Sequence, residues 1–193
     1  MPVIGILALQ GSIEEHLDLF GKIKGVSARK IKYAAELKEI DALVIPGGES
    51  TTMGKLLRDF GLLEPAADRI KNGMPVWGTC AGMILLAKNI VGEQTVHLGA
   101  MDISARRNAY GSQLDSFKTT ALIPAVSEKE IPLVFIRAPW VESVGENVRV
   151  LACINGKIAA ARQDNMLATA FHPELTEDAS FHKYFVDMVR KKM

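Results

Sequence analysis

The residues best suited to chemistry lie in Gly-Thr-Cys-Ala-Gly at residues 78–82. Cys80 stands between an apolar run and an apolar helical pattern, with Gly78 and Gly82 two positions to either side. This arrangement is typical of a nucleophile elbow, a strand–turn–helix whose crowded backbone needs small residues beside the nucleophile. The turn puts the thiol at a helix N-terminus, which favours thiolate, and points the Ala81 N–H at an oxyanion formed above Cys80. The sequence therefore predicts a cysteine nucleophile.

The second cysteine is not predicted to take part. Cys153 lies inside a predicted strand with no glycine elbow, and we expect it to be a core residue. Two distant cysteines in different contexts predict neither a disulfide framework nor a zinc site.

A thiol nucleophile needs a base, and His172 is the best placed of the four histidines. It occurs in Phe-His-Pro-Glu at residues 171–174, at the end of an apolar run. In an extended chain residues two apart share a face, so Glu174 can lie beside His172 while Pro173 faces away. A carboxylate on one ring nitrogen leaves the other facing the nucleophile and stabilises the imidazolium. The pair is predicted to be the base and its orienting group.

The remaining histidines are predicted to lie outside the chemistry. His16 stands among acidic residues of a predicted helix, so we expect a solvated residue or one at the rim of the site. His97, in an apolar segment, is expected to be a hydrogen-bonded structural residue. His182 falls in the predicted C-terminal helix and is expected at the surface.

The elements that position these residues follow from the hydrophobic pattern. Apolar runs at residues 3–9, 40–45 and 74–79 read as strands. Helical patterns follow them, beginning near residue 12 and covering residues 52–59 and 81–89. Alternation of this kind predicts a parallel sheet with helices on both faces.

The second half of the chain predicts antiparallel strands. Asn155-Gly156 between the runs at 148–154 and 157–162 is typical of a type I′ hairpin, and a turn at 164–165 precedes a strand at 166–171. Residues 176–192 form an amphipathic pattern that ends the chain as a helix. Together these patterns predict one α/β domain over residues 1–193, in three layers around a mixed, mostly parallel sheet.

Composition excludes several classes of partner. The chain is 48% hydrophobic and 23% charged, with a net charge of +1, so nothing favours nucleic acid or a membrane surface. The first apolar run lacks a preceding Lys or Arg and closes at Gln10-Gly11, which indicates a buried strand rather than a signal peptide. We expect a cytoplasmic protein.

Several segments, taken together, give a closer resemblance. They are Leu-Gln-Gly at 9–11, Pro-Gly-Gly-Glu-Ser-Thr-Thr-Met at 46–53, Arg-Asn-Ala-Tyr-Gly at 107–111, Asp-Ser-Phe at 115–117, Phe-Ile-Arg-Ala-Pro at 135–139 and Phe-His-Pro-Glu-Leu-Thr at 171–176. With the cysteine elbow they resemble class I glutamine amidotransferases, and most closely the glutaminase subunit family of pyridoxal 5′-phosphate synthase, the PdxT family. The resemblance extends along the whole chain.

The resemblance implies a flavodoxin-like α/β fold and a triad of Cys80, His172 and Glu174. It also implies a set of residues that contact L-glutamine: Gly48, Glu49, Ser50, Arg107, Ile136 and Arg137. It implies no cofactor or metal. The implied partner is a synthase subunit of the PdxS type in a large hetero-oligomer, which receives the ammonia and builds pyridoxal phosphate from a pentose phosphate and a triose phosphate.

Elementary chemistry agrees with these assignments. The glycines of Pro46-Gly47-Gly48 let the backbone turn the Gly48 N–H inward as a second oxyanion donor beside Ala81. Arg107 or Arg137 can hold the α-carboxylate of glutamine, and Glu49 can face its ammonium group. The apolar run at 134–139 favours a poorly solvated Arg137.

Other functions remain to be weighed against this one. A phosphate loop at Gly47-Gly48 is disfavoured because no Gly-Lys-Ser/Thr follows. The glutaminase of another amidotransferase, such as imidazole glycerol phosphate synthase, would share the triad. A glutamine sensor without turnover would not need all three of its residues.

Overall fold

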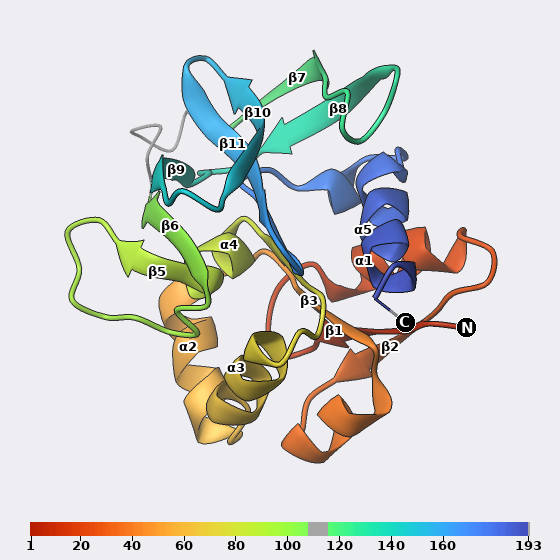
Figure 1. The fold of residues 1–193 in the computed structure, drawn as a ribbon, viewed down its shortest axis with the longest axis vertical. Helices are drawn as coiled ribbons and strands as arrows, with labels where there is room; N and C mark the ends of the chain where they lie inside the picture. The colour runs from red at the N-terminus through yellow and green to blue at the C-terminus, as the bar shows by residue number, and fades with distance from the viewer. Residues whose placement is uncertain (108–115, 193) are drawn as a thin grey trace.

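The protein is described by a computed structural model that covers residues 1–107 and 116–192. The predicted segment 107–111 and the first residue of 115–117 therefore fall largely outside the described residues, although Arg107 itself is included. Figure 1 shows a central sheet with α1 (Ile13–Gly21) and α5 (Ser180–Arg190) on one side and α2 (Ser50–Asp59) and α3 (Leu63–Lys71) on the other. This confirms the three-layer α/β architecture.

The main sheet is mixed, as predicted. Within the described residues its strands run in the order β2-β1-β3-β4-β12-β11-β9-β6-β5, with β10 added beside β11. The N-terminal half contributes parallel strands: β1 (Val3–Leu7), β2 (Ser27–Ile31), β3 (Ala42–Ile45) and β4 (Val76–Thr79). β12 (Met166–Thr169) pairs parallel with β4 and antiparallel with β11 (Lys157–Gln163), so it joins the two halves.

The predicted hairpin is confirmed. β10 (Arg149–Ile154) pairs antiparallel with β11, and both turn residues have positive φ, 51° at Asn155 and 74° at Gly156. A type I′ turn needs that backbone conformation at both central positions, which is why Asn-Gly favours it.

Several elements were not predicted. They are β2, α3, the 3-10 helix η1 (Ala34–Glu39), and the strands β5 (Ala87–Ile90), β6 (Met101–Arg106), β7 (Phe117–Leu122), β8 (Glu130–Phe135) and β9 (Trp140–Val144). β7 and β8 form a separate two-stranded sheet. The helix predicted over 81–89 was wrong in length, because α4 (Ala81–Leu86) ends after six residues and the chain continues directly into β5.

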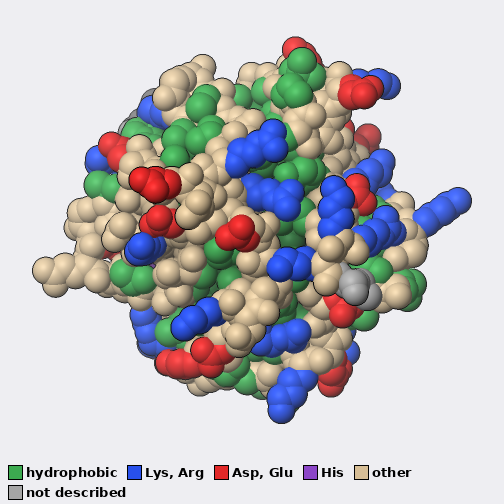
Figure 2. All heavy atoms as spheres, in the orientation of Figure 1, with side chains coloured by type: hydrophobic (Ala, Val, Ile, Leu, Met, Phe, Trp, Pro, Cys, Tyr) green, Lys and Arg blue, Asp and Glu red, His purple; other side chains and the backbone are tan. Residues whose placement is uncertain are grey.

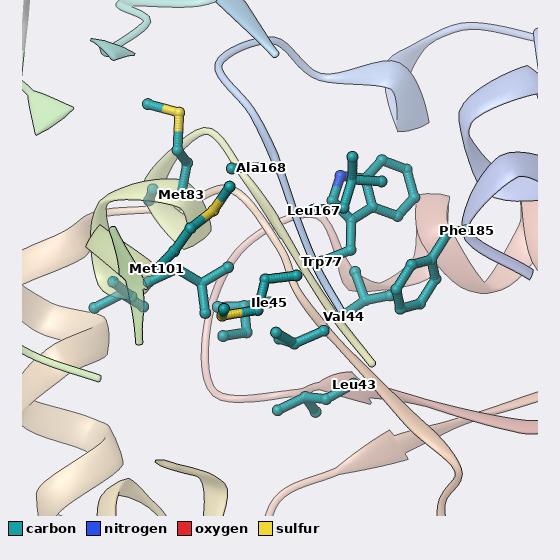
Figure 3. Packing of buried hydrophobic residues seen from close by; sticks show 14 of the residues in the cluster. Leu43, Val44, Ile45, Trp77, Met83, Met101, Leu167, Ala168 and Phe185 are labelled. Atoms are coloured by element: carbon teal, nitrogen blue, oxygen red, sulfur yellow. The ribbon is translucent and has the colours of Figure 1, made fainter. Parts of the chain in front are cut away.

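The core fills both sides of the parallel strands. In Figure 3, Trp77 and Phe185 lie on one side of the labelled strand segments, and Met83 and Met101 lie on the other. α5 turns the predicted apolar face inward, with Phe181, Phe185, Met188 and Val189 all buried. Burial on both faces of the sheet explains why the sequences of β3 and β4 are continuous apolar runs.

The surface carries charges of both signs. Figure 2 shows basic and acidic side chains intermingled with apolar ones on one face of the molecule. No helix within the described ranges has the length and apolar character required to cross a lipid bilayer.

Candidate active site

The candidate site lies where parallel strands end. Cys80 follows β4 directly, His172 follows the neighbouring β12 by three residues, and Gly47 comes shortly after β3. Adjacent parallel strands deliver their carboxyl ends to one edge of a sheet, and ligands of open α/β sheets bind in the crevice there. The topology therefore brings together three segments that are far apart in the sequence.

The elbow at Cys80 has the geometry predicted from its glycines. Cys80 adopts φ 48° and ψ −104°, a conformation that non-glycine residues rarely take and that is typical of functional sites. A Cβ on Gly78 would lie 2.4 Å from the Gly82 carbonyl oxygen, and one on Gly82 would lie 2.0 Å from the Ile45 carbonyl oxygen. Both glycines are required because each one faces rigid backbone at closer than van der Waals distance.

The elbow also places a backbone donor beside the thiol. Cys80 is the N-cap of α4, so the N–H of Ala81 belongs to the first turn and has no acceptor within the helix. The Cys80 N–H itself donates to the Thr169 carbonyl at 2.8 Å, which fixes the elbow to β12. The Ala81 N–H is therefore a donor available at the opening of the site.

His172 and Glu174 pair as predicted, but by a different local structure. Nδ1 of His172 lies 2.7 Å from Oε1 of Glu174, and both side chains are buried. The segment is not extended: residues Pro173–Leu175 form a 3-10 helix, η2, with His172 as its N-cap. Pro173 begins this turn with a φ that suits it, and the turn rather than a shared strand face brings Glu174 back to the imidazole.

Electrostatics favour a protonated His172. Burial alone would lower the pKa of His172, but the Cys80 sulfur and the Glu174 carboxylate raise it to about 10. Burial would likewise raise the pKa of Glu174, yet it lies below its ordinary value because His16 and His172 face the carboxylate. The arrangement therefore supports an imidazolium at neutral pH, held between a sulfur and a carboxylate.

A cleft of about 590 Å³ opens above Cys80. Its volume is in the range of pockets that bind small molecules. Nine of the predicted site residues line it: Gly48, Glu49, Ser50, Cys80, Ala81, Arg107, Ile136, Arg137 and His172. Glu174 lies behind His172, away from the opening.

The two predicted arginines differ in their partners. Arg107 pairs with Glu49 at 3.3 Å and with Glu93 at 3.1 Å, and it also donates to Thr51 Oγ1. Arg137 makes no hydrogen bond or ion pair with any described residue, and it stands at φ 43° on the cleft wall. The expectation that Arg137 is poorly solvated was wrong, since its side chain is exposed. Of the two, Arg137 is the guanidinium with donors available to a ligand.

The loop opposite the elbow is fixed by the segment before α1. The Ser12 N–H donates to the Gly47 carbonyl at 3.3 Å, and the Glu49 N–H donates to Gln10 Oε1 at 3.1 Å. Glu49 caps α2 by accepting from the N–H groups of Thr51 and Thr52. Burial opposes ionisation, but these hydrogen bonds lower the pKa of Glu49 to about 2. Glu49 is therefore an anion at the edge of the cleft.

Three predictions about histidines and one about the second cysteine were wrong. His16 and His182 are fully buried rather than solvated, and they contact each other behind Glu174. His97 packs against Gly54, but its Nδ1 has no hydrogen-bond partner among the described residues. Cys153 lies on the exposed face of β10 and not in the core.

Some residues in and behind the site were missed, although the sequence holds a signal for His16, which lies behind Glu174. Ser12, Glu15, Ile84, Pro139 and Leu175 also line the cleft. His16 stands three residues after Ile13 and four before Phe20, which places it on the inward face of α1 by helical spacing alone. The acidic neighbours of His16 lie on other faces of the same helix.

No cluster of metal-ligating side chains occurs within residues 1–107 and 116–192. The groups in the cleft suit an organic substrate: a thiol, an imidazole, backbone N–H donors, a carboxylate and the guanidinium of Arg137, which has no partner among the described residues. A cysteine on an elbow with a His–Glu pair behind it can carry out acyl transfer through a thioester.

Fold and site together define a glutamine amidotransferase of class I. Among solved structures, one described as a glutamine amidotransferase superposes with a TM-score of 0.91 at 40% identity, covering 97% of this chain and 98% of that one. A putative GMP synthase subunit from Thermoplasma acidophilum shares the fold, with a TM-score of 0.70 at 16% identity.

The family is established by the sequence match. Residues 6–191 match the SNO glutamine amidotransferase family, and the chain belongs to it. The chain is 58% identical over 183 residues to pyridoxal 5′-phosphate synthase subunit PdxT of Caldanaerobacter subterraneus, covering 95% of this chain and 97% of that protein. It is 57% identical over 189 residues to the protein of the same name from Ruminiclostridium cellulolyticum, covering 98% of this chain and all of that protein.

Proposed function

We propose that this chain is the glutaminase subunit of a pyridoxal 5′-phosphate synthase, and that it hydrolyses L-glutamine through Cys80, His172 and Glu174. The observation that carries the proposal is the convergence of an elbow cysteine and a buried His–Glu pair on one cleft. The names of the relatives at 57–58% identity favour this synthase over imidazole glycerol phosphate synthase. A sensor without turnover has no use for an intact triad.

The reaction proceeds by acyl transfer in two stages. The Cys80 thiolate attacks the side-chain amide carbon of glutamine, and the oxyanion accepts hydrogen bonds from Ala81 and Gly48. His172 gives its proton to the amide nitrogen, which leaves as ammonia, and a glutamyl thioester remains. His172 then takes a proton from water, the resulting hydroxide attacks the thioester, and glutamate leaves as the thiolate of Cys80 is restored.

The ends of the substrate are assigned by charge. Arg137, which is unpaired among the described residues, faces the α-carboxylate, and Glu49 faces the α-ammonium group. Arg107 holds Glu49 in place through their ion pair. Gly48, Ser50 and Ile136 complete the contacts with glutamine.

The ammonia is used by a synthase subunit that docks over the cleft, within a large hetero-oligomer. Ile136 and Leu175 are exposed apolar residues that line the opening, at 38% and 39% exposure. Apolar groups at the rim suit a covering partner that keeps ammonia from bulk water. A reactive thiol at Cys80 and the exposed free thiol of Cys153 both favour the reducing cytoplasm.

The nucleophile is tested by labelling with an electrophilic glutamine analogue, read by peptide mass spectrometry. We expect label on Cys80 alone and no glutamate release from Cys80→Ala. Cys153 is the matched control because it is exposed yet has no elbow, so Cys153→Ala should keep its activity. Turnover by Cys80→Ala, or labelling of Cys153 by the analogue, would remove Cys80 from this role.

Activation by the partner is tested by titration. The Gly47 carbonyl is bound by Ser12 at 3.3 Å, a long hydrogen bond that a docked chain could break to turn the Gly48 N–H. One additional oxyanion donor raises kcat roughly 10²–10³-fold. Glutamate release should therefore rise by that order when a PdxS-type synthase subunit is added. Equal kcat with and without the subunit would reject activation.

A further inference from the structure

Two buried histidines that the proposed reaction does not use lie directly behind Glu174. His16 on α1 and His182 on α5 are both 0% exposed. Nδ1 of His16 lies 2.9 Å from Nε2 of His182. On its other side, Nε2 of His16 lies 3.6 Å from Oε2 of Glu174 and 3.4 Å from Thr79 Oγ1. The histidines therefore extend the triad inward, from Glu174 into the core.

The second oxygen of Glu174 has little else to bind. Oε1 accepts from His172, whereas Oε2 is buried and has no hydrogen bond of ordinary length with any described residue. A buried carboxylate oxygen without a donor is costly, so a nearby N–H has a large effect on where the carboxylate sits. His16 Nε2 lies 3.6 Å from this oxygen and 3.4 Å from Thr79 Oγ1, so a small shift would let it supply that N–H.

Charge and geometry fix which nitrogen of each ring carries a proton. Burial lowers the pKa of His16, although the Glu174 carboxylate opposes this, and burial places the pKa of His182 well below its ordinary value, so both rings are neutral at neutral pH. If His16 carries its proton on Nε2, it presents an N–H to Glu174 and accepts from His182 through Nδ1. The opposite tautomer would turn the Nε2 lone pair towards a carboxylate, with the Thr79 hydroxyl as its donor, and would leave the Nδ1–H of His182 buried without an acceptor. The first arrangement is therefore the stable one.

Aromatic packing holds the two rings in this orientation. Trp77 meets both edge-on, with ring centroids 5.5 Å from His16 and 4.9 Å from His182. Phe20 stacks at 6.5 Å from His16 and meets His182 edge-on at 4.8 Å. A ring boxed in this way cannot rotate without disturbing the core, so its N–H is a fixed donor.

We propose that His16, oriented by His182, is a positioning residue for Glu174 and, through it, for His172. This inference rests on the proposed glutaminase function. His16 does not touch the substrate cleft; it fixes the free oxygen of Glu174, so that the other oxygen stays aligned with Nδ1 of His172. Without it, the carboxylate can rotate towards any remaining donor, and the imidazole loses its orientation towards Cys80.

The kinetic test compares three variants in glutamine hydrolysis, assayed with the synthase subunit present. His16→Leu removes the donor, and kcat should fall roughly 10–100-fold, the loss typical of residues that orient a functional group from behind, with KM unchanged. His16→Gln places an amide N–H where Nε2 was and should recover most of that loss. Phe185→Leu disturbs the core of the same layer without a polar change, where the ring centroid of Phe185 lies 5.7 Å from that of Trp77. Among the described residues Phe185 makes no ring contact with either histidine, so this variant should lower the melting temperature and leave kcat unchanged.

Two outcomes of this comparison overturn the proposal. The first is parental kcat in His16→Leu. The second is an equal loss of kcat in Phe185→Leu, which would assign the effect to packing.

A spectroscopic test needs no variant and no turnover. In protein labelled with ¹⁵N-histidine, the two nitrogen shifts of His16 report its tautomer, and we expect the proton on Nε2. A proton on Nδ1 would refute the inference, since His16 would then offer Glu174 no donor. If the chain releases no glutamate at all, the proposed function fails, but this measurement still decides whether His16 faces Glu174 with an N–H.

Discussion

Gly47 is the position where one added methyl group should act on the chemistry and not on the fold. A Cβ at Gly47 would lie 2.3 Å from Cε1 of His172 and 2.9 Å from its Nδ1. Ordinary contact begins at 3.4 Å, so Gly47→Ala must move the loop and the imidazole apart by about 1 Å. Neither has an easy way to move.

Both sides of that contact are already bound. The imidazole is held by Glu174 at 2.7 Å, and the His172 backbone N–H donates to the Val134 carbonyl at 2.8 Å. The loop is held through the Gly47 carbonyl by Ser12. Whichever side gives way, either the base or the Gly48 oxyanion donor leaves its position.

A displacement of about 1 Å in a catalytic group can cost 10²-fold in rate, which corresponds to about 2.7 kcal/mol in the barrier. Gly47→Ala should therefore lower kcat for glutamine hydrolysis by that order and slow the labelling of Cys80 by a glutamine analogue. Gly47 does not have a positive φ, so the backbone conformation itself accommodates alanine and the free energy of unfolding should change little.

The matched control is Gly21→Ala at the end of α1, where a Cβ would meet nothing within 4 Å. It should keep full activity and gain up to about 1 kcal/mol of stability. The reasoning fails if Gly47→Ala hydrolyses glutamine at the parental rate. That result would mean that the loop does not pack on His172.

Three further predictions follow from the site. The imidazole of His172 should stay protonated up to about pH 10 in NMR titrations, while the other described histidines are neutral by pH 8. Because the pKa of His172 is raised, the contribution of its ion pair to stability is fully present below about pH 6.5 and is lost as the pH rises through about 10. A His172 that titrates near pH 6.5 would refute the ion pair. Arg137→Ala should raise KM for glutamine by roughly 10–100-fold with little change in kcat; an unchanged KM would remove Arg137 from the carboxylate site. Gly82→Ala should lower the free energy of unfolding by about 3 kcal/mol or more, because its Cβ would meet backbone at 2.0 Å, and urea denaturation would contradict this if the midpoint stayed the same.

The parts of the site that follow from local backbone constraints could be predicted from the sequence. The role of the glycines around Cys80 could be predicted because only glycine fits where a Cβ would clash with a carbonyl oxygen. The hairpin at Asn155-Gly156 could be predicted for a similar reason, because Asn-Gly is a residue pair that accepts the positive φ both positions require. In each case the constraint is a property of a few consecutive residues.

Features that depend on distant partners were predicted poorly. His16 and His182 are polar residues that become buried only because α1 and α5 meet on the same face of the sheet. Cys153 is exposed because β10 lies at a branch of the sheet, covered on fewer sides than a central strand. Pairing of His172 with Glu174 was predicted correctly but for an extended chain, whereas a 3-10 turn makes the contact.

The segment that begins α1 connects the two halves of the proposed chemistry. Gln10 and Ser12 hold the loop that carries the Gly48 donor, and one turn later His16 faces Glu174. Residues 10–12 directly precede α1, with Ser12 as its N-cap, so a shift of this segment would be passed to the first turn of the helix, where His16 follows. A partner that shifts the start of α1 would therefore act on the oxyanion donor and on the orientation of the base in the same motion. Such a link would explain the proposed activation, in which the glutaminase stays slow until an acceptor for its ammonia is in place although the proposed catalytic side chains are already assembled.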